Sequence, residues 1–162
     1  MTSETSTGTA VVTLTGDTTI LITRDFNAPR DLLWRAWTEP ELIRRWWAGE
    51  KGTVTLVESD LRVGGTWRQV MVADGGFEVG FHGEFREIVE LEKIICTETF
   101  EGMPDAYSVN TITFSEQDGR TGLVMLIEHT QAAHRDAHIG SGMEEGMQGS
   151  MDALERVAVS LR

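Results

Sequence analysis

The chain has 162 residues, of which 40% are hydrophobic and 25% charged, as in ordinary soluble globular proteins. Its formal net charge of −12 disfavours nucleic acid and anionic membrane surfaces as partners. No apolar run reaches the length of about 18 residues that a membrane span needs, and the N-terminus has no basic-then-apolar leader. The single cysteine, Cys96, agrees with a reducing compartment, so we expect a cytoplasmic protein without a membrane span.

The first half of the chain predicts a tail, a strand and two short helices. Residues 1–16 are rich in Thr, Ser and Gly and are expected to form a flexible N-terminal tail, although residues 11–14 could add a short strand. Residues 17–26 are β-branched and apolar, which predicts a strand. Pro29 then favours the first turn of a helix. The sequence Thr-Glu-Pro-Glu at 38–41 predicts a capping box that begins a second helix at once.

The second half predicts a meander of strands followed by a long helix. The period-two segments are 52–59, 65–73, 77–89, 92–100, 107–116 and 121–130. Short turns between them, such as Asp118-Gly119, predict antiparallel pairing. About the last 20 residues return to helical periodicity, with an apolar stripe from Met143 to Leu161. We therefore expect an α+β fold in which this helix lies across the concave face of a curved sheet and leaves a cavity.

Several sequence blocks resemble those of a known family. In chain order they are Ala28-Pro29, Ala36-Trp37-Thr38-Glu39-Pro40, Trp46-Trp47, Asp60-Leu61-Arg62-Val63-Gly64-Gly65 with Trp67, and residues 81–88. Over about residues 17–162 the chain resembles the START-like (SRPBCC, Bet v 1-like) superfamily, in the branch of the activator of Hsp90 ATPase homologue 1-like C-terminal domain. The resemblance implies one START-like domain with a helix-grip fold. Such a fold has a curved antiparallel sheet of six to seven strands around a long C-terminal helix, with two short helices after the first strand.

Strand and helix parity predicts the wall of the cavity. Met143, Met147 and Met151 recur every four residues, and methionine suits a wall that adapts to different guests. The predicted wall residues are Trp67, Met71, Phe81, Phe85, Ile112, Phe114, Met125, Met143, Met147 and Met151. His82 is either one polar anchor in this cavity or a polar residue satisfied elsewhere. The tryptophans at helical spacing, between Trp34 and Trp47, are interpreted mainly as core, with a pocket-lining role open for at least one of them.

Other chemistry has no local signature. Three histidines lie between 129 and 138, but the glutamate of the zinc hydrolase motif is missing, so we predict no metal and no cofactor. No nucleophile is paired with a base, so no catalytic residue is assigned. A convergence of His82, Glu84 and Glu98 in the cavity would be the sign of an enzyme.

These features favour the binding of a small hydrophobic or aromatic molecule, for sequestration, transport or sensing. The family resemblance implies a second hypothesis, a chaperone-linked interaction protein of the Hsp90 ATPase activator type with a role in stress responses. A third is a START-like cyclase or hydrolase that acts on a bound metabolite. A homodimer is a possible assembly.

Overall fold

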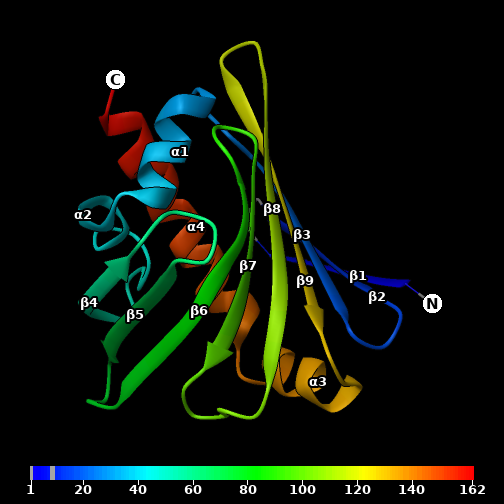
Figure 1. Cartoon of the computed structure of the whole chain (residues 1–162). Helices are drawn as coiled ribbons and strands as arrows, with labels where there is room; N and C mark the ends of the chain where they lie inside the picture. Colours follow the sequence, from blue (N-terminus) through cyan, green and yellow to red (C-terminus); the bar gives the residue numbers. More distant parts are fainter. Residues whose placement is uncertain (1, 8–9) are drawn as a thin grey trace.

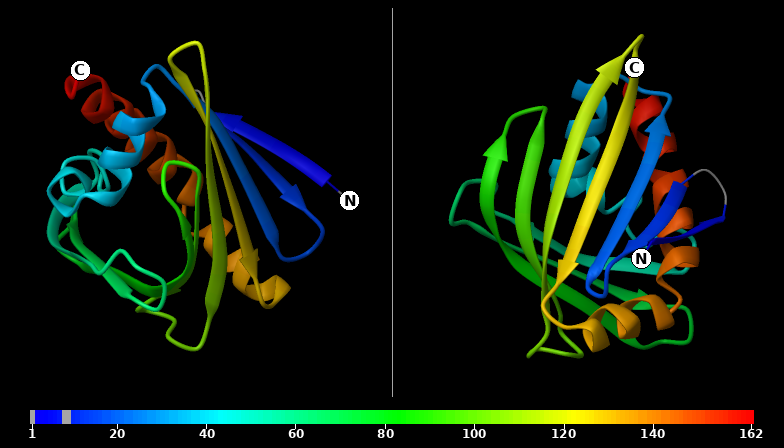
Figure 2. Two further views of the ribbon diagram at one scale, coloured as in Figure 1. Left: turned by 45° about the horizontal axis from the view of Figure 1, so that its top comes forward. Right: turned by 90° about the vertical axis from the view of Figure 1, so that its right-hand side faces the viewer.

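The computed structural model describes residues 2–7 and 10–162, with side chains from residue 10 onward. Within these residues, nine strands form one antiparallel sheet that curves strongly (Figures 1 and 2). The strands are β1 (Thr2–Thr7), β2 (Ala10–Thr15), β3 (Thr19–Phe26), β4 (Gly52–Ser59), β5 (Thr66–Ala73), β6 (Glu78–Val89), β7 (Lys93–Phe100), β8 (Tyr107–Gln117) and β9 (Arg120–His129). Their order across the sheet is β1-β2-β3-β9-β8-β7-β6-β5-β4, so β3 lies beside the last strand.

Helices cover the concave face of this sheet. They are α1 (Arg30–Thr38), α2 (Pro40–Ile43), α3 (Ala132–Gly140) and α4 (Met143–Ser160). Figure 2 shows the sheet wrapped around α4, with α1 and α2 beside the C-terminal end of that helix. The expected helix-grip arrangement is therefore confirmed, with two or three strands more than expected. Among the described residues, no helix combines the length and apolar character that crossing a bilayer requires.

The predicted capping box at residues 38–41 is wrong. Thr38 is the last residue of α1, and its hydroxyl donates to the Trp34 carbonyl at 2.7 Å. The N-cap of α2 is Glu39, which makes no side-chain capping bond. A threonine that still lies inside a helix satisfies the carbonyl four residues earlier instead of capping the next helix.

The expectation of a flexible tail at residues 1–16 also needs correction, because β1 and β2 occupy most of this segment (residues 1, 8 and 9 lie outside the described part). The buried side chain of Gln148 accepts from the Ala10 N–H at 3.2 Å and donates to the Ala10 carbonyl at 2.9 Å. Val12 is buried together with Ile20 and Ile127. Gln148 and Ile127, which contact this strand, lie far away in the sequence, so composition alone could not reveal these contacts.

Helix α3 was not predicted from the sequence. None of its residues is fully buried, so it lacks the apolar stripe that identifies a packed helix. It is separated from α4 by Gly142, which adopts a positive φ of 82°. That conformation ends one helix and turns the chain into the next at little steric cost because glycine has no Cβ.

A buried charge holds α4 against β3. The Arg24 side chain is 3% exposed, and its guanidinium lies 2.8 Å from an Asp152 oxygen and 3.4 Å from a Glu155 oxygen. It also stacks over the Phe26 ring at 4.8 Å. Because Arg24 is buried, these carboxylates are needed to compensate for the water that its guanidinium loses.

Candidate functional site

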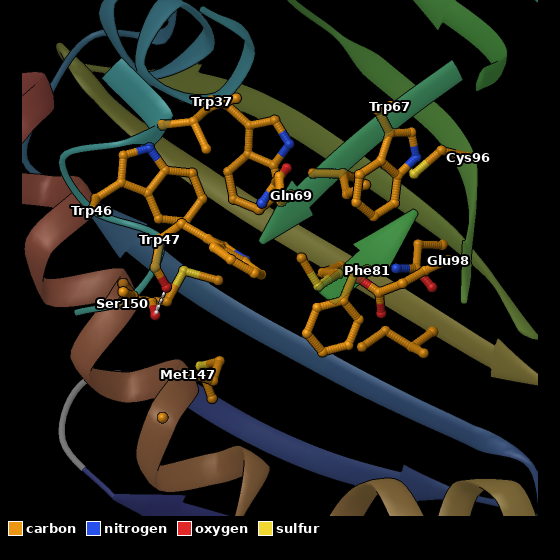
Figure 3. Close-up of a pocket in the computed structure, with 18 of the residues that line it drawn as sticks. Trp37, Trp46, Trp47, Trp67, Gln69, Phe81, Cys96, Glu98, Met147 and Ser150 are labelled. Carbon is orange, nitrogen blue, oxygen red and sulfur yellow. Dashed lines mark hydrogen bonds between the residues drawn. The ribbon is translucent and has the colours of Figure 1, made fainter. Parts of the chain in front are cut away.

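A cavity of about 370 Å³ lies between the N-terminal half of α4 and the concave face of the sheet (Figure 3). Its volume falls within the range of small-molecule sites. Its floor is a row of side chains that are paired across four adjacent strands: Ile94 of β7, Ile112 of β8, Met125 of β9 and Ile22 of β3. The row is continuous because the residues that directly face each other in a sheet project to the same side.

Nine of the eleven predicted site residues line this cavity. They are Trp67, Met71, Phe81, Phe85, Ile112, Met125, Met143, Met147 and Met151. Alternation along the strands and helical spacing predicted that these residues face inward, and the curvature of the sheet brings them around one cavity. That they contact a ligand stays a prediction.

Phe114 and His82 do not line the cavity. Phe114 does point inward, but it lies further along β8 beneath α1, where its ring packs against Trp34 at 5.3 Å and Trp37 at 6.1 Å. His82 follows the inward-facing Phe81 and so projects from the outer face, as neighbouring strand residues do. There its Nδ1 lies 2.9 Å from a Glu101 oxygen.

The outer face around His82 carries a small charged cluster. Arg68 donates two hydrogen bonds of 2.8 Å to Glu101, the same carboxylate that His82 contacts. The hydrogen bonds from Arg68 and then His82 lower the pKa of Glu101 to about 2. Because Arg68 and His82 are exposed and Glu101 is only half-buried, this cluster contributes little to stability.

Trp67 forms a fixed part of the cavity wall. Its indole nitrogen on β5 reaches across β6 and donates to the Thr97 carbonyl of β7 at 3.2 Å. The ring lies over Gly83 of β6, where any Cβ would collide with both the Thr97 carbonyl and the indole nitrogen. Glycine at 83 is therefore the residue that lets the ring lie against the sheet.

Helix α1 and the loop after α2 bring further aromatic rings to the cavity. Trp47 meets Phe81 edge-on with ring centroids 5.8 Å apart, and Trp37 lies 5.3 Å from Trp46. Trp37, Trp46 and Trp47 all line the cavity, although the sequence favoured a core role for them. The carbonyl of Trp47 accepts from the Ser150 hydroxyl at 2.6 Å, which attaches this loop to α4. The sequence signal that could have identified a pocket-lining role is the high density of tryptophan between residues 34 and 47.

Helix α4 contributes a flexible and uneven wall. Met143, Gly146, Met147, Ser150 and Met151 of this helix all line the cavity. A Cβ added at Gly146 would have no atom within 4 Å, so the space beside this glycine is empty. Methionine side chains have several low-energy shapes, which lets such a wall adapt to a guest.

The main polar feature of the wall is Glu98. It follows Ile94 and Cys96 at alternate positions of β7 and lines the cavity with them. Burial raises the pKa of Glu98, and a hydrogen bond from Asn110 opposes this shift only in part. Burial, with a smaller contribution from the Glu98 charge, also raises the pKa of Cys96 to about 12, so its thiol stays protonated and unreactive.

The arrangement expected for an enzyme is not formed. His82 and Glu84 are exposed on the outer face of β6, whereas Glu98 faces the cavity on β7. The three groups that would have to act on one substrate are therefore on opposite sides of the sheet.

Two histidines meet at one edge of the cavity. His129 Nε2 lies 3.0 Å from His138 Nδ1, and His138 lines the cavity. Burial, and next the charge of the neighbouring His129, lower the pKa of His138 to about 4. Within residues 2–7 and 10–162, no group of three or more His, Cys, Asp or Glu side chains is arranged to hold a metal ion.

Solved structures of bacterial proteins share this fold. A Rhodobacter sphaeroides protein superposes with a TM-score of 0.87 and 22% identity, covering 94% of this chain and 99% of its own. A Nitrosomonas europaea protein has a TM-score of 0.80 and 22% identity, with 91% and 97% coverage. A Chromobacterium violaceum protein has a TM-score of 0.77 and 27% identity, with 87% and 96% coverage.

No curated protein matches the chain. The family model described as "Activator of Hsp90 ATPase homolog 1-like protein" matches residues 27–158, which span α1 to most of α4. The match covers well over half of the chain and includes every element that contributes to the cavity wall except β3. The chain therefore belongs to the family of activator of Hsp90 ATPase homolog 1-like proteins.

Proposed function

We propose that this protein binds a small hydrophobic or aromatic molecule in the cavity between the sheet and α4. The observation that supports this proposal is the cavity itself, about 370 Å³ in volume and lined mainly by apolar side chains, among them tryptophan, phenylalanine, methionine and isoleucine. Sites of this size and composition bind drug-sized molecules largely by burying their apolar surface. Sequestration, transport or sensing in the cytoplasm would need nothing more than this binding.

Native mass spectrometry of protein purified from its own host tests the proposal directly. We expect a retained small molecule that leaves when the protein is denatured. In parallel, the neutral fluorescent compound N-phenyl-1-naphthylamine should bind with enhanced emission, as it does in apolar surroundings. Protein that is always empty and that leaves this compound dark would overturn the proposal.

A matched pair of glycine variants locates the binding. Gly146→Leu adds a side chain where the cavity has open space, so we expect the affinity for N-phenyl-1-naphthylamine to fall at least about tenfold. Gly140→Leu adds the same side chain to the exposed end of α3, outside the cavity lining, and should bind as the wild type does. Equal binding by both variants would place the compound elsewhere on the protein.

Family membership favours a second candidate function, the stimulation of a chaperone ATPase. Measuring the ATPase rate of Hsp90 with and without this protein tests it. Stimulation that Gly146→Leu leaves intact would support an interaction surface separate from the cavity. An unchanged ATPase rate would exclude the function for the chaperone tested.

A further inference from the structure

The polar part of the cavity wall suggests which class of molecule binds, an inference that rests on the proposed function. Among the described lining residues, Glu98 is the only carboxylic acid. It lies beside Ile94 and Cys96 on the same strand and near Asn110 of the next strand, in a wall that is mostly apolar. A buried carboxyl is costly in an apolar wall unless something compensates for its lost water. The side chains around Glu98 therefore indicate which chemical group of a ligand could replace the water that this carboxyl loses.

The protein supplies only part of the compensation. Asn110 is the hydrogen-bond partner of Glu98 in the part of the chain that the structure describes. The Asn110 carbonyl oxygen is already occupied, because it accepts from the Ser108 hydroxyl at 2.9 Å. This contact orients the Asn110 amide so that its NH₂ group donates to Glu98. One amide cannot satisfy a carboxylate, which has about four acceptor sites, so the rest of the group is available to a guest.

Aromatic rings lie on the same side of the cavity. Figure 3 shows the rings of Trp67 and Phe81 near Glu98. Trp67 is held in place by its bond to Thr97, and Phe81 by its edge contact with Trp47. The faces of such rings attract organic cations, most strongly where water is excluded. A carboxyl beside aromatic rings is thus a suitable environment for an ammonium group.

None of the described lining residues offers a comparable partner for an anion. Lys51 lines it too, but its ammonium pairs with Glu145 at 3.0 Å and both side chains are largely exposed. His138 is hydrogen-bonded to His129, and its low pKa keeps it neutral near neutral pH. A carboxylate ligand would therefore lose its water without gaining a cation. The net charge of −12 adds a long-range preference for cations.

We propose that the ligand is a lipophilic amine, with its ammonium group at Glu98 and its apolar body among the tryptophan and methionine side chains. Burial raises the pKa of Glu98 in the empty cavity, and an ammonium group beside it would oppose this shift by favouring the ionised carboxylate. In those molecules whose Glu98 carries a proton, binding of the ammonium breaks the O–H bond, the carboxylate pairs with the ammonium and the proton leaves to solvent. The other titratable groups that line the cavity are Cys96 on the same strand, Lys51 after α2 and His138 on α3.

Three naphthalene compounds that differ only in their polar group test the proposal. They are 1-naphthylmethylamine, 1-naphthalenemethanol and 1-naphthoate, each measured as a competitor of N-phenyl-1-naphthylamine at about neutral pH. We expect the amine to bind at least about tenfold more tightly than the alcohol, and the carboxylate to bind more weakly than both. An alcohol that binds as tightly as the amine would overturn the proposal.

Glu98→Gln keeps the size of the side chain but cannot ionise. We expect it to abolish the preference for the amine while changing the affinity for the alcohol by less than about threefold. Glu84→Gln removes one charge from the exposed face of the neighbouring strand and should retain the preference. A preference that survives in Glu98→Gln would show that net charge alone attracts the amine, and the proposal would fail.

Calorimetry provides a measurement that would not differ between the wild type and Glu98→Gln if Glu98 had only a structural role. Titrations of the amine in two buffers with different ionisation heats should reveal the release of up to one proton per amine bound, and no release in Glu98→Gln. Release that is equal in both proteins would contradict the proposal.

The failure of this inference can be told apart from the failure of the proposed function. If N-phenyl-1-naphthylamine does not bind the wild type, the proposed function itself fails. If it binds and the protein shows no preference for the amine over the alcohol, only the inference about the amine fails.

Discussion

The two halves of α4 border very different interiors. Beneath the C-terminal half, Leu154 and Ala158 are completely buried and Val157 is nearly so, in a core that they share with Leu33 and Phe114. Beneath the N-terminal half, side chains of the same helix line a cavity of about 370 Å³. One helix on one sheet thus has a packed end and a hollow end.

The difference comes from α1 and from the residue types on α4. At the packed end α1 lies against α4 and β8, and the edge of Trp34 meets the Phe114 ring at 5.3 Å. This second layer fills the space that the curved sheet leaves open. At the hollow end α4 presents glycine, serine and unbranched methionine, which do not fill a fixed shape. A cavity persists where no second layer of side chains covers the sheet.

The largest expected effect is on the packed end. Leu154→Ala should lower the free energy of unfolding by about 2–5 kcal/mol, because it creates a void in a closely packed core. Met147→Ala at the hollow end should lower the free energy of unfolding clearly less, because the Met147 side chain already borders the cavity. Urea unfolding monitored by tryptophan fluorescence measures both. Equal losses would mean that the two interiors are packed alike.

The next effect concerns the attachment of the N-terminal strands. Gln148→Leu removes the two hydrogen bonds between this amide and the backbone of Ala10, so we expect the free energy of unfolding to fall by about 1–3 kcal/mol. Hydrogen exchange of the β2 amides should quicken more than that of β8, since β2 depends on α4. Unchanged exchange in β2 would show that Ala10 does not need this contact.

A smaller effect separates two glycines of α4. Both Gly146→Ala and Gly149→Ala remove a flexible residue from a helix interior, and in both cases the added Cβ has no atom within 4 Å. Each should raise the free energy of unfolding by up to about 1 kcal/mol. Only Gly146→Ala should weaken the binding of N-phenyl-1-naphthylamine, because Gly149 does not line the cavity. Weaker binding in both variants would point to a change in the helix itself.

The last effect appears only in acid and concerns the hollow end. The pKa of His138 falls from its ordinary 6.5 to about 4 in the folded protein, so between these values the unfolded chain binds more protons. Stability is therefore lost as the pH falls from about 6.5 towards 4. His138→Gln should flatten this part of the stability profile, and His134→Gln on the same helix serves as the control. An unchanged profile in His138→Gln would assign the acid sensitivity to other groups.

The strands and the inward-facing residues could be predicted because they depend on local patterns. The boundaries of β4 to β9 follow from alternating side chains and from turns such as Asp118-Gly119. The same alternation identified Trp67, Ile112 and Met125 as inward-facing. For Phe114 the prediction failed because of distance along the chain. Phe114 has the right parity, but only the placement of α1 shows that it belongs to the packed end.

The sequence by itself determined the family, the order of the strands from β3 to β9 with the long helix α4, and the inner face of the sheet, since periodicity depends on residues a few positions apart. Only the tertiary structure decided which inward-facing side chains line the cavity and which form the packed core. It also placed Glu98 in the cavity and His82 outside it, and it joined Gln148 to Ala10. These results depend on sheet curvature and on contacts between residues far apart in the chain, which local patterns do not encode.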